Sequence, residues 1–176
     1  NAFTIALGVS SLVLVALYPF AKRFTYWPQL VLGLTFNWGA LLGWAAVRGS
    51  IELPAILLYA AGVVWTLGYD TIYAHQDKED DILIGVKSTA LKFGDSTKMW
   101  LVGFYAMAVI LIGYGVHLTG PAIPFYGLSL LAVVHLIWQI KAVDINDPAK
   151  CMVVFKSNRD FGLILFIAIV FGSMPI

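Results

Sequence analysis

The sequence predicts an all-α fold, a polytopic membrane bundle with six transmembrane helices in this chain. The chain is 60% hydrophobic and only 12% charged, with a mean hydropathy of +0.86, as membrane proteins are. Long segments carry no charged residue at all. These segments also lack the alternation of polar and apolar residues that barrel strands require, so helices are favoured over strands.

The uncharged segments place the six helices in order. Because a helix needs about 20 apolar residues to cross the hydrocarbon core, the long uncharged segment 99–140 must fold back once. The sequence Thr119-Gly120-Pro121, with Pro124, supplies the turn. The predicted spans are 2–20, 28–47, 53–72, 99–118, 122–141 and 160–175.

The charged residues are divided unevenly between the two ends of these helices. Ten of the eleven Lys and Arg residues fall in the loops on one side, and only Arg48 lies opposite. The positive-inside rule assigns the crowded side to the cytoplasm or the mitochondrial matrix. Nine of the ten acids lie in the same loops, Glu52 being the exception, so the polar chemistry is expected on that side too.

The chain is interpreted as one domain, residues 1–176, because no internal repeat, low-complexity stretch or linker divides it. Its first residue is Asn, and residues 1–21 lack the basic start of a signal peptide. We therefore expect an amino-terminally incomplete piece of a longer protein. The lone Cys151 excludes an intrachain disulfide and argues against a zinc site. The lipid bilayer is an expected partner and nucleic acid is not, while the oligomeric state is left open.

An acidic stretch, YDTIYAHQDKEDD at 69–81, carries five carboxylates in thirteen positions. On a helix Asp77 and Asp81 are four residues apart, so they share a face about 5–6 Å from each other. Paired carboxylates suit Mg²⁺, a hard cation that substrate phosphates commonly complete. Lys87 follows closely and offers a point charge to the same phosphates. The alternative is a solvated loop, which composition alone does not distinguish from a site.

Carboxylates, magnesium and lysine beside an apolar bundle indicate a lipid diphosphate as substrate, with its tail among the helices. The expected chemistry is ionisation of the diphosphate ester. Magnesium would offset the charge that grows on the departing diphosphate. The allylic cation left behind needs a dry pocket lined by aromatic faces.

The stretch GYDTIYAHQDKEDDILIGVKSTALKFG resembles the second aspartate-rich motif of the UbiA superfamily of intramembrane prenyltransferases. Within the superfamily it is most similar to the branch that attaches a polyprenyl group to 4-hydroxybenzoate in ubiquinone biosynthesis. The segments LYPFAKRFTYWPQLVLGLTFNWGALLGWAAV, HLIWQIKAVDINDP and FKSNRDFG extend the resemblance along essentially the whole chain. It implies a nine-helix bundle, magnesium as cofactor, and polyprenyl diphosphate and an aromatic acid as substrates.

The resemblance also implies roles for individual residues. Asp77 and Asp81 correspond to the magnesium-binding pair, and Asp70 to an acid that orients substrate or accepts a proton. Arg23, in YPFAKR, matches an active-site arginine that holds the aromatic carboxylate or the diphosphate. The residues expected to bind substrate are Lys22, Lys87, Asn37 and Arg159, with helix packing as the alternative for Asn37.

One departure from the family pattern concerns the first aspartate motif, N-D-x-x-D-x-x-x-D, which this chain lacks. The six spans resemble the fourth to ninth helices of the nine. The chain thus holds half of the metal site, and we expect it to be inactive alone. The expected location is a bacterial inner membrane, with the mitochondrial inner membrane as the alternative.

Three other functions fit part of the pattern. Another UbiA-type enzyme, with a different prenyl acceptor, would share the metal site. A divalent-cation transporter is disfavoured because its acids should lie at mid-membrane depth, whereas residues 53–69 are uncharged. A non-catalytic subunit that pairs with a separate amino-terminal half is the third alternative.

Overall fold

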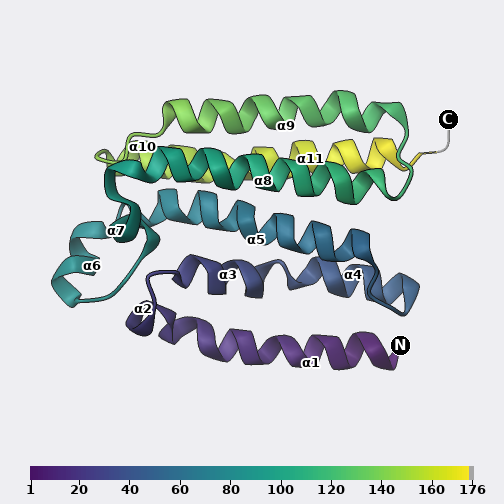
Figure 1. Cartoon of the computed structure of the whole chain (residues 1–176), viewed down its shortest axis with the longest axis horizontal. Coiled ribbons are helices and arrows are strands. Elements are labelled where there is room, and N and C mark those ends of the chain that lie inside the picture. Colours follow the sequence, from purple (N-terminus) through teal and green to yellow (C-terminus); the bar gives the residue numbers. More distant parts are fainter. Residues whose placement is uncertain (175–176) are drawn as a thin grey trace.

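The computed structural model describes residues 1–174, and within that range the chain contains helices and no strand, as the sequence predicts (Figure 1). Two short 3₁₀ helices, Tyr18–Phe20 and Gly94–Ser96, join neighbouring α-helices. The α-helices are α1 (Ala2–Leu17), α2 (Ala21–Phe24), α3 (Pro28–Phe36), α4 (Trp38–Arg48), α5 (Leu53–Ala74), α6 (Lys78–Ile84), α7 (Thr89–Phe93), α8 (Thr97–His117), α9 (Ile123–Ala142), α10 (Pro148–Lys156) and α11 (Asn158–Gly172).

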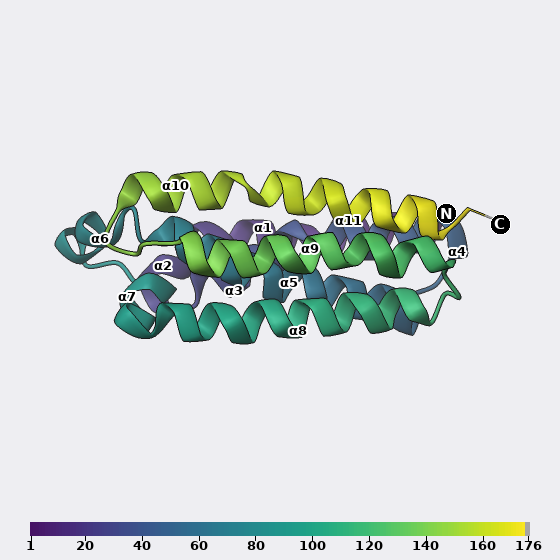
Figure 2. The same ribbon diagram turned by 90° about the horizontal axis from the view of Figure 1, so that it is seen from above.

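The long helices lie side by side and alternate in direction, as expected for successive membrane crossings (Figure 1). The central helix is α5, which packs against α8 on one side and against α3 and α4 on the other. On the far side of α8, α9 packs along α11 (Figure 2). The predicted turn between α8 and α9 is confirmed, since Gly120 has the positive φ of 69° that favours glycine there.

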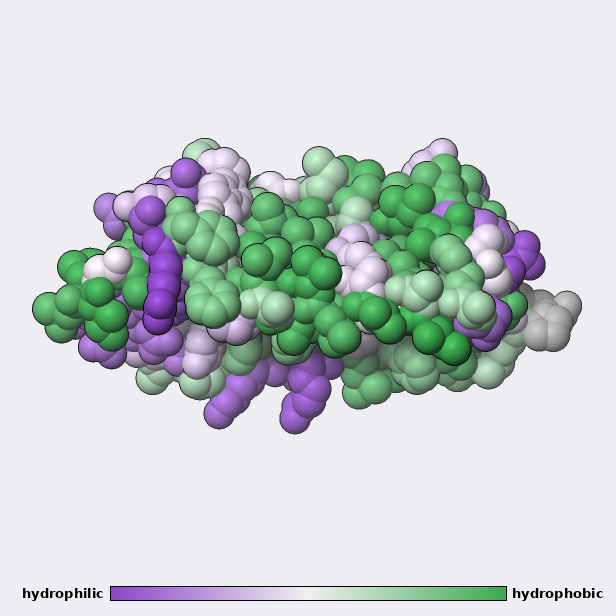
Figure 3. All heavy atoms as spheres, turned by 90° about the horizontal axis from the view of Figure 1, so that it is seen from below, coloured by the Kyte–Doolittle hydropathy of each residue, from purple (hydrophilic) through white to green (hydrophobic). Residues whose placement is uncertain are grey.

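Five segments are long and apolar enough to cross a bilayer among the described residues, in agreement with the first five predicted spans. They are Ala2–Phe24, Pro28–Arg48, Leu53–Ala74, Thr89–His117 and Ile123–Ala142. Figure 3 shows a broad hydrophobic surface over the middle of the molecule, hydrophilic residues towards its ends and a few hydrophilic side chains that project from its lower edge.

The sixth predicted span, 160–175, needs correction. It corresponds to α11, which has 15 residues and is therefore shorter than the about 20 that a crossing requires. The charges of Lys156, Arg159 and Asp160 keep the apolar segment short. In Figure 2, α10 and α11 follow one line, so the pair runs the length of the bundle although α11 alone does not. Residue 175 lies outside the described residues.

The second predicted span, 28–47, is interrupted at Asn37, between α3 and α4. The Asn37 side-chain amide donates hydrogen bonds to the carbonyl oxygen of Gly33 (2.8 Å) and to Oγ1 of Thr66 on α5 (2.9 Å). Asparagine competes with the helix by bonding nearby backbone groups, which explains the interruption. Gly62 of α5 lies so close to Asn37 that a Cβ atom there would collide with the amide.

We expect the substitution Gly62→Ala to destabilise the bundle by about 1–3 kcal/mol, because the added methyl group must displace Asn37 or separate α4 from α5. The measurement is the thermal unfolding temperature of the protein in detergent. Gly43→Ala is the matched control, since a Cβ atom at Gly43 meets no atom within 4 Å. Equal unfolding temperatures for the two variants would contradict the packing role of Asn37.

Candidate active site at the charged end of the bundle

The acidic stretch lies where α5 leaves the bundle and the chain turns into the short helix α6, at the end that also carries α2 and α7 (Figure 1). Asp77 is the residue that precedes α6, and its carbonyl oxygen accepts a hydrogen bond from the Asp81 backbone N–H at 2.8 Å. The two acids are therefore one backbone turn apart, on a helix separate from α5. The helix ends at Ile84 and is followed by Gly85, whose φ of 76° lets the chain reverse towards α7.

Asp81 is buried and forms an ion pair with Lys22, 59 residues earlier in the chain. Oδ1 of Asp81 lies 2.9 Å from Nζ of Lys22. The Asp81 side chain is 6% exposed and that of Lys22 is 42% exposed. The lysine therefore reaches from solvent to an otherwise buried carboxylate. A backbone hydrogen bond from Lys87 to the carbonyl oxygen of Lys22 (2.8 Å) joins the same two segments.

The second carboxylate oxygen of Asp81, Oδ2, is buried and has no hydrogen-bond partner. A buried acceptor without a partner is costly, so such an oxygen is suited to receive a cation or a donor from a ligand. This fits a magnesium ligand. The described residues contain no cluster of three or more His, Cys, Asp or Glu side chains that would hold a metal ion by itself. The assignment of Asp77 and Asp81 as a metal-binding pair therefore stays a prediction.

Asp70 and Lys22 line one small cavity of about 120 Å³, which is otherwise bounded by Tyr18, Pro19, Pro28 and Gln29. Gln29 is buried, and its side-chain oxygen accepts a hydrogen bond from the backbone N–H of Thr89 at 3.1 Å. This bond fastens the start of α3 to the start of α7, so it fixes one wall of the cavity. Lys22 thus connects the cavity beside Asp70 to the buried carboxylate of Asp81.

Lys87 joins the same region through the segment that follows α2. Its Nζ donates to the carbonyl oxygen of Phe24 at 3.4 Å and lies 5.3 Å from the centre of the Tyr26 ring. Lys92 lies 5.9 Å from the same ring and 5.4 Å from that of Trp27. Lys87 and Lys92 therefore lie against the segment 22–27, which itself carries Lys22, and this end of the bundle can attract an anion.

Of the sequence-predicted residues only Lys22 and Asp70 line the cavity, and three of the others lie away from this region or point out of it. Arg23 is exposed, with its guanidinium carbon 6.0 Å from the centre of the Phe20 ring. Asn37 lies within the bundle and uses both amide hydrogens in helix packing. Arg159 is 84% exposed at the start of α11 and pairs with Asp160 at 2.8 Å. Their roles in substrate binding stay predictions.

Gln29 and Lys92 are features of this region that the sequence did not single out, whereas the sequence marks His75 either as a substrate contact or as a loop residue of the motif. His75 is buried, and its Nε2 lies 2.9 Å from Oγ1 of Thr97. Thr97 already donates its hydroxyl hydrogen to the Gly94 carbonyl oxygen, so His75 Nε2 is the donor. Burial, and then the charge of Lys78, lowers the pKa of His75 to about 4, so the ring is neutral at pH 7. His75 thereby fastens the end of α5, two residues before Asp77, to the start of α8.

The fold and the site together define a class: a helical membrane protein with a carboxylate and lysine site at the edge of the bilayer. The profile of the UbiA prenyltransferase family matches residues 1–171, and the chain belongs to this family. The family resemblance inferred from the sequence is thereby confirmed.

The chain is similar over nearly all of its length to 4-hydroxybenzoate polyprenyltransferases named as mitochondrial. It is 56% identical to the protein of Bos taurus, 55% to that of Homo sapiens and 51% to that of Arabidopsis thaliana. These matches cover 99%, 99% and 98% of this chain, and 47%, 47% and 42% of the respective relatives. The chain therefore spans about half the length of the curated relatives it matches.

Two solved structures share the fold. One is a UbiA homologue from Aeropyrum pernix K1, with a TM-score of 0.77 and 24% identity, matched over 97% of this chain and 64% of its own. The other is a digeranylgeranylglyceryl phosphate synthase, with a TM-score of 0.77 and 20% identity, matched over 98% of this chain and 62% of its own. Both support the membrane-bundle fold.

The ion pair between Lys22 and Asp81 should be revealed by a double-mutant cycle. Because Lys22→Met leaves a buried carboxylate without its partner, we expect a loss of about 1–3 kcal/mol in the free energy of unfolding. The loss should be smaller when Asp81→Asn is added. Lys150→Met is the control: Lys150 pairs with Asp144 at 3.2 Å, both side chains are exposed, and solvent screens such a pair, so its loss should change the free energy of unfolding little. Additive effects of the two substitutions at Lys22 and Asp81 would argue against the pair.

Proposed function

We propose that a protein carrying this chain transfers a polyprenyl group from polyprenyl diphosphate to the carbon ortho to the hydroxyl of 4-hydroxybenzoate, in ubiquinone biosynthesis. The observation that carries the proposal is the identity of 51–56% with 4-hydroxybenzoate polyprenyltransferases along nearly the whole chain. The site at the charged end supports it, because acids and lysines meet where an apolar bundle begins.

Magnesium is the proposed cofactor, and Asp77 and Asp81 are the residues of this chain that would hold it. The buried, unpartnered Oδ2 of Asp81 supports this assignment. When bound, the ion would neutralise charge on the diphosphate. The family's first aspartate motif would supply further ligands, and this chain does not contain it.

The diphosphate is proposed to bind against Lys22 and Lys87. Both lysines lie at the segment that follows α1, one bound to Asp81 and the other beside Phe24 and Tyr26. As the bond between the prenyl carbon and the diphosphate oxygen breaks, these ammonium groups stabilise the negative charge left on the leaving group. A phosphate oxygen can also accept from Lys22 while Asp81 does, since an ammonium group has three donors.

The ring carbon of 4-hydroxybenzoate that gains the prenyl group must afterwards lose a proton. We propose that Asp70 accepts it, because its carboxylate lines the cavity that also contains Lys22. The new carbon–carbon bond forms with the electron pair of the aromatic ring, and loss of the proton restores the aromatic system. Arg23, Asn37 and Arg159 are retained as proposed substrate-binding residues on the family resemblance alone.

The proposed location is the mitochondrial inner membrane, with the charged end facing the matrix. The relatives from cow, human and plant are named as mitochondrial, which favours this compartment over the bacterial inner membrane. The excess of basic residues at one end of the bundle supports the orientation. The prenyl tail of the substrate would lie among the apolar helices.

A chimaera tests the activity. The matching segment of the Bos taurus relative is replaced by this chain, and prenyl transfer to 4-hydroxybenzoate is measured in isolated membranes. We expect activity, and a decrease of about 100-fold or more for Asp77→Ala and for Asp81→Ala. Asp144→Ala, an exposed acid in the loop after α9, is the control and should stay within about twofold.

Two outcomes of this assay would contradict the proposal. An inactive chimaera that is inserted and folded would contradict the assignment to this reaction, whereas full activity in both acidic variants would contradict the metal site alone. Transfer to a different aromatic acceptor in preference to 4-hydroxybenzoate would identify another branch of the family. The isolated 176-residue chain, assayed in parallel, is expected to be inactive.

The metal dependence is tested separately in the same membranes. Chelation with EDTA should abolish prenyl transfer, and added Mg²⁺ should restore it. Because Asp81 is a proposed ligand, Asp81→Asn should raise the Mg²⁺ concentration for half-maximal activity by about tenfold or more. Unchanged magnesium dependence in this variant, with activity retained, would remove Asp81 from the metal site.

A further inference from the structure

Between α8 and α9 the helix surfaces diverge and leave a groove. α8 packs chiefly along α5 and α9 chiefly along α11, so the two neighbours touch each other at few positions. Two cavities of about 430 Å³ and 320 Å³ open between them, and both are bounded by Val109 and Val133. They follow one another along the helices and share these two residues as walls, and we call them together the α8–α9 seam.

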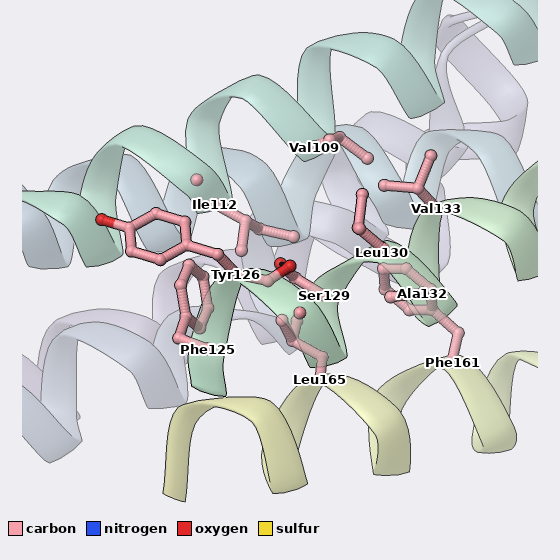
Figure 4. A pocket seen from close by; sticks show the side chains of 12 residues that line it. Val109, Ile112, Phe125, Tyr126, Ser129, Leu130, Ala132, Val133, Phe161 and Leu165 are labelled. Atoms are coloured by element: carbon pink, nitrogen blue, oxygen red, sulfur yellow. Dashed lines mark hydrogen bonds between the residues drawn. The ribbon is translucent and has the colours of Figure 1, made fainter. Parts of the chain in front are cut away.

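The lining of the seam is hydrocarbon. Figure 4 shows the larger cavity, with Val109 and Ile112 of α8 facing Leu130 and Val133 of α9, and Phe161 and Leu165 of α11 beneath them. The polar groups along the seam already have partners. The Ser129 hydroxyl donates to the Tyr126 carbonyl oxygen at 3.0 Å, and the Tyr105 hydroxyl donates to Gln139 at 2.8 Å. A ligand here needs no hydrogen-bonding groups.

The length of the seam matches one leaflet of a membrane. Along α8 it extends from Val102 to Gly113, which at about 1.5 Å per residue is about 16 Å. The hydrocarbon core of a bilayer is about 30 Å thick, so each leaflet contributes about half. A helix, about 10 Å across, does not fit, because α8 and α9 remain in contact. A single extended hydrocarbon chain is thin enough to fit in the seam.

Two lysines stand at the charged end of the seam. On α8, Lys98 shares a face with Val102, Tyr105 and Val109, which follow it at helical spacing. On α9, Lys141 shares a face with Ile137, four residues before it. Both lysines are exposed.

Neither Lys98 nor Lys141 forms a salt bridge among residues 1–174. The pKa of Asp144 is lowered first by the backbone hydrogen bond from Asn146, then by Lys150, and least by the charge of Lys98; this acid is already bound by Lys150 at 3.2 Å. Two positive charges are therefore left to attract an anion at the level of the lipid headgroups.

We propose that the α8–α9 seam binds an anionic phospholipid, with one acyl chain in the two cavities and its phosphate against Lys98 and Lys141. This site is separate from the candidate active site. Asp70, Lys22 and Asp81 lie towards α1 and α3, whereas the seam lies beyond α8, on the other side of α5 (Figure 1). Basic residues at the end of an apolar groove between helices are a recurrent arrangement for anionic lipids.

The charge requirement is tested with the chain in detergent, by native mass spectrometry and thermal unfolding with phosphatidylglycerol and with phosphatidylcholine of the same acyl chains. Phosphatidylglycerol should bind more tightly and raise the unfolding temperature more. The double substitution Lys98→Gln and Lys141→Gln should weaken its binding about 30-fold. Lys156→Gln, an exposed lysine on α10 outside the seam, should leave binding unchanged.

The groove itself is tested by filling it. A Cβ atom at Gly113, in the seam, or at Gly103, outside it on the same helix, meets no atom within 4 Å. Gly113→Leu should therefore remove bound lipid while Gly103→Leu retains it, although both replace a helical glycine by leucine. Equal binding of the two lipids, retention of phosphatidylglycerol in Gly113→Leu or in the double lysine variant, or a second copy of the chain in place of lipid would each overturn the proposal.

Discussion

The ion pair between Lys22 and Asp81 is the interaction on which the candidate site depends. It joins two segments 59 residues apart, and the Lys87 backbone bond to Lys22 closes the same junction. Without this junction the acidic turn would be tied to the bundle only on its other side, where Lys78 donates to Asn146 at 3.1 Å. With it, the turn lies against the end of α1 and α2, next to the cavity that contains Asp70. The Lys22 ammonium and the Asp81 carboxylate thus bind each other in place of the water that would otherwise solvate their charges.

The ion pair also leaves the two oxygens of the Asp81 carboxylate in different environments. Oδ1 is satisfied by Lys22, and Oδ2 is buried without a partner. A carboxylate whose two oxygens both have hydrogen-bond partners would gain little from binding a ligand. A carboxylate exposed to water would bind a ligand weakly, because water competes for its oxygens. The half-satisfied state is unfavourable for folding and favourable for binding, a combination that is common at functional sites. Lys22, being partly exposed, remains within reach of an anion in the cavity.

Much of the fold could be predicted from the sequence, because hydropathy reports directly on membrane insertion. The five longer spans, the turn at Gly120 and the gathering of charges at one end all follow from local composition. The interruption at Asn37 could not be predicted, since it depends on Thr66 and Gly62 of another helix. The same holds for the Gln29 bond to Thr89, which shapes the cavity. The acidic stretch indicated where the candidate site lies, but its pairing with Lys22 depends on tertiary packing, which a local sequence pattern does not show.

The break at Asn37 has a consequence for how the chain is assembled in the membrane. Neither α3, with 9 residues, nor α4, with 11, is long enough to be inserted alone, so the two must enter the bilayer as one segment. At that moment the side chain of Asn37 can reach Gly33 on its own helix but not Thr66, which is synthesised later. The final angle between α3 and α4 is therefore set only after α5 has been inserted beside them. The packing of α5 thus determines the geometry of two helices that precede it in the chain.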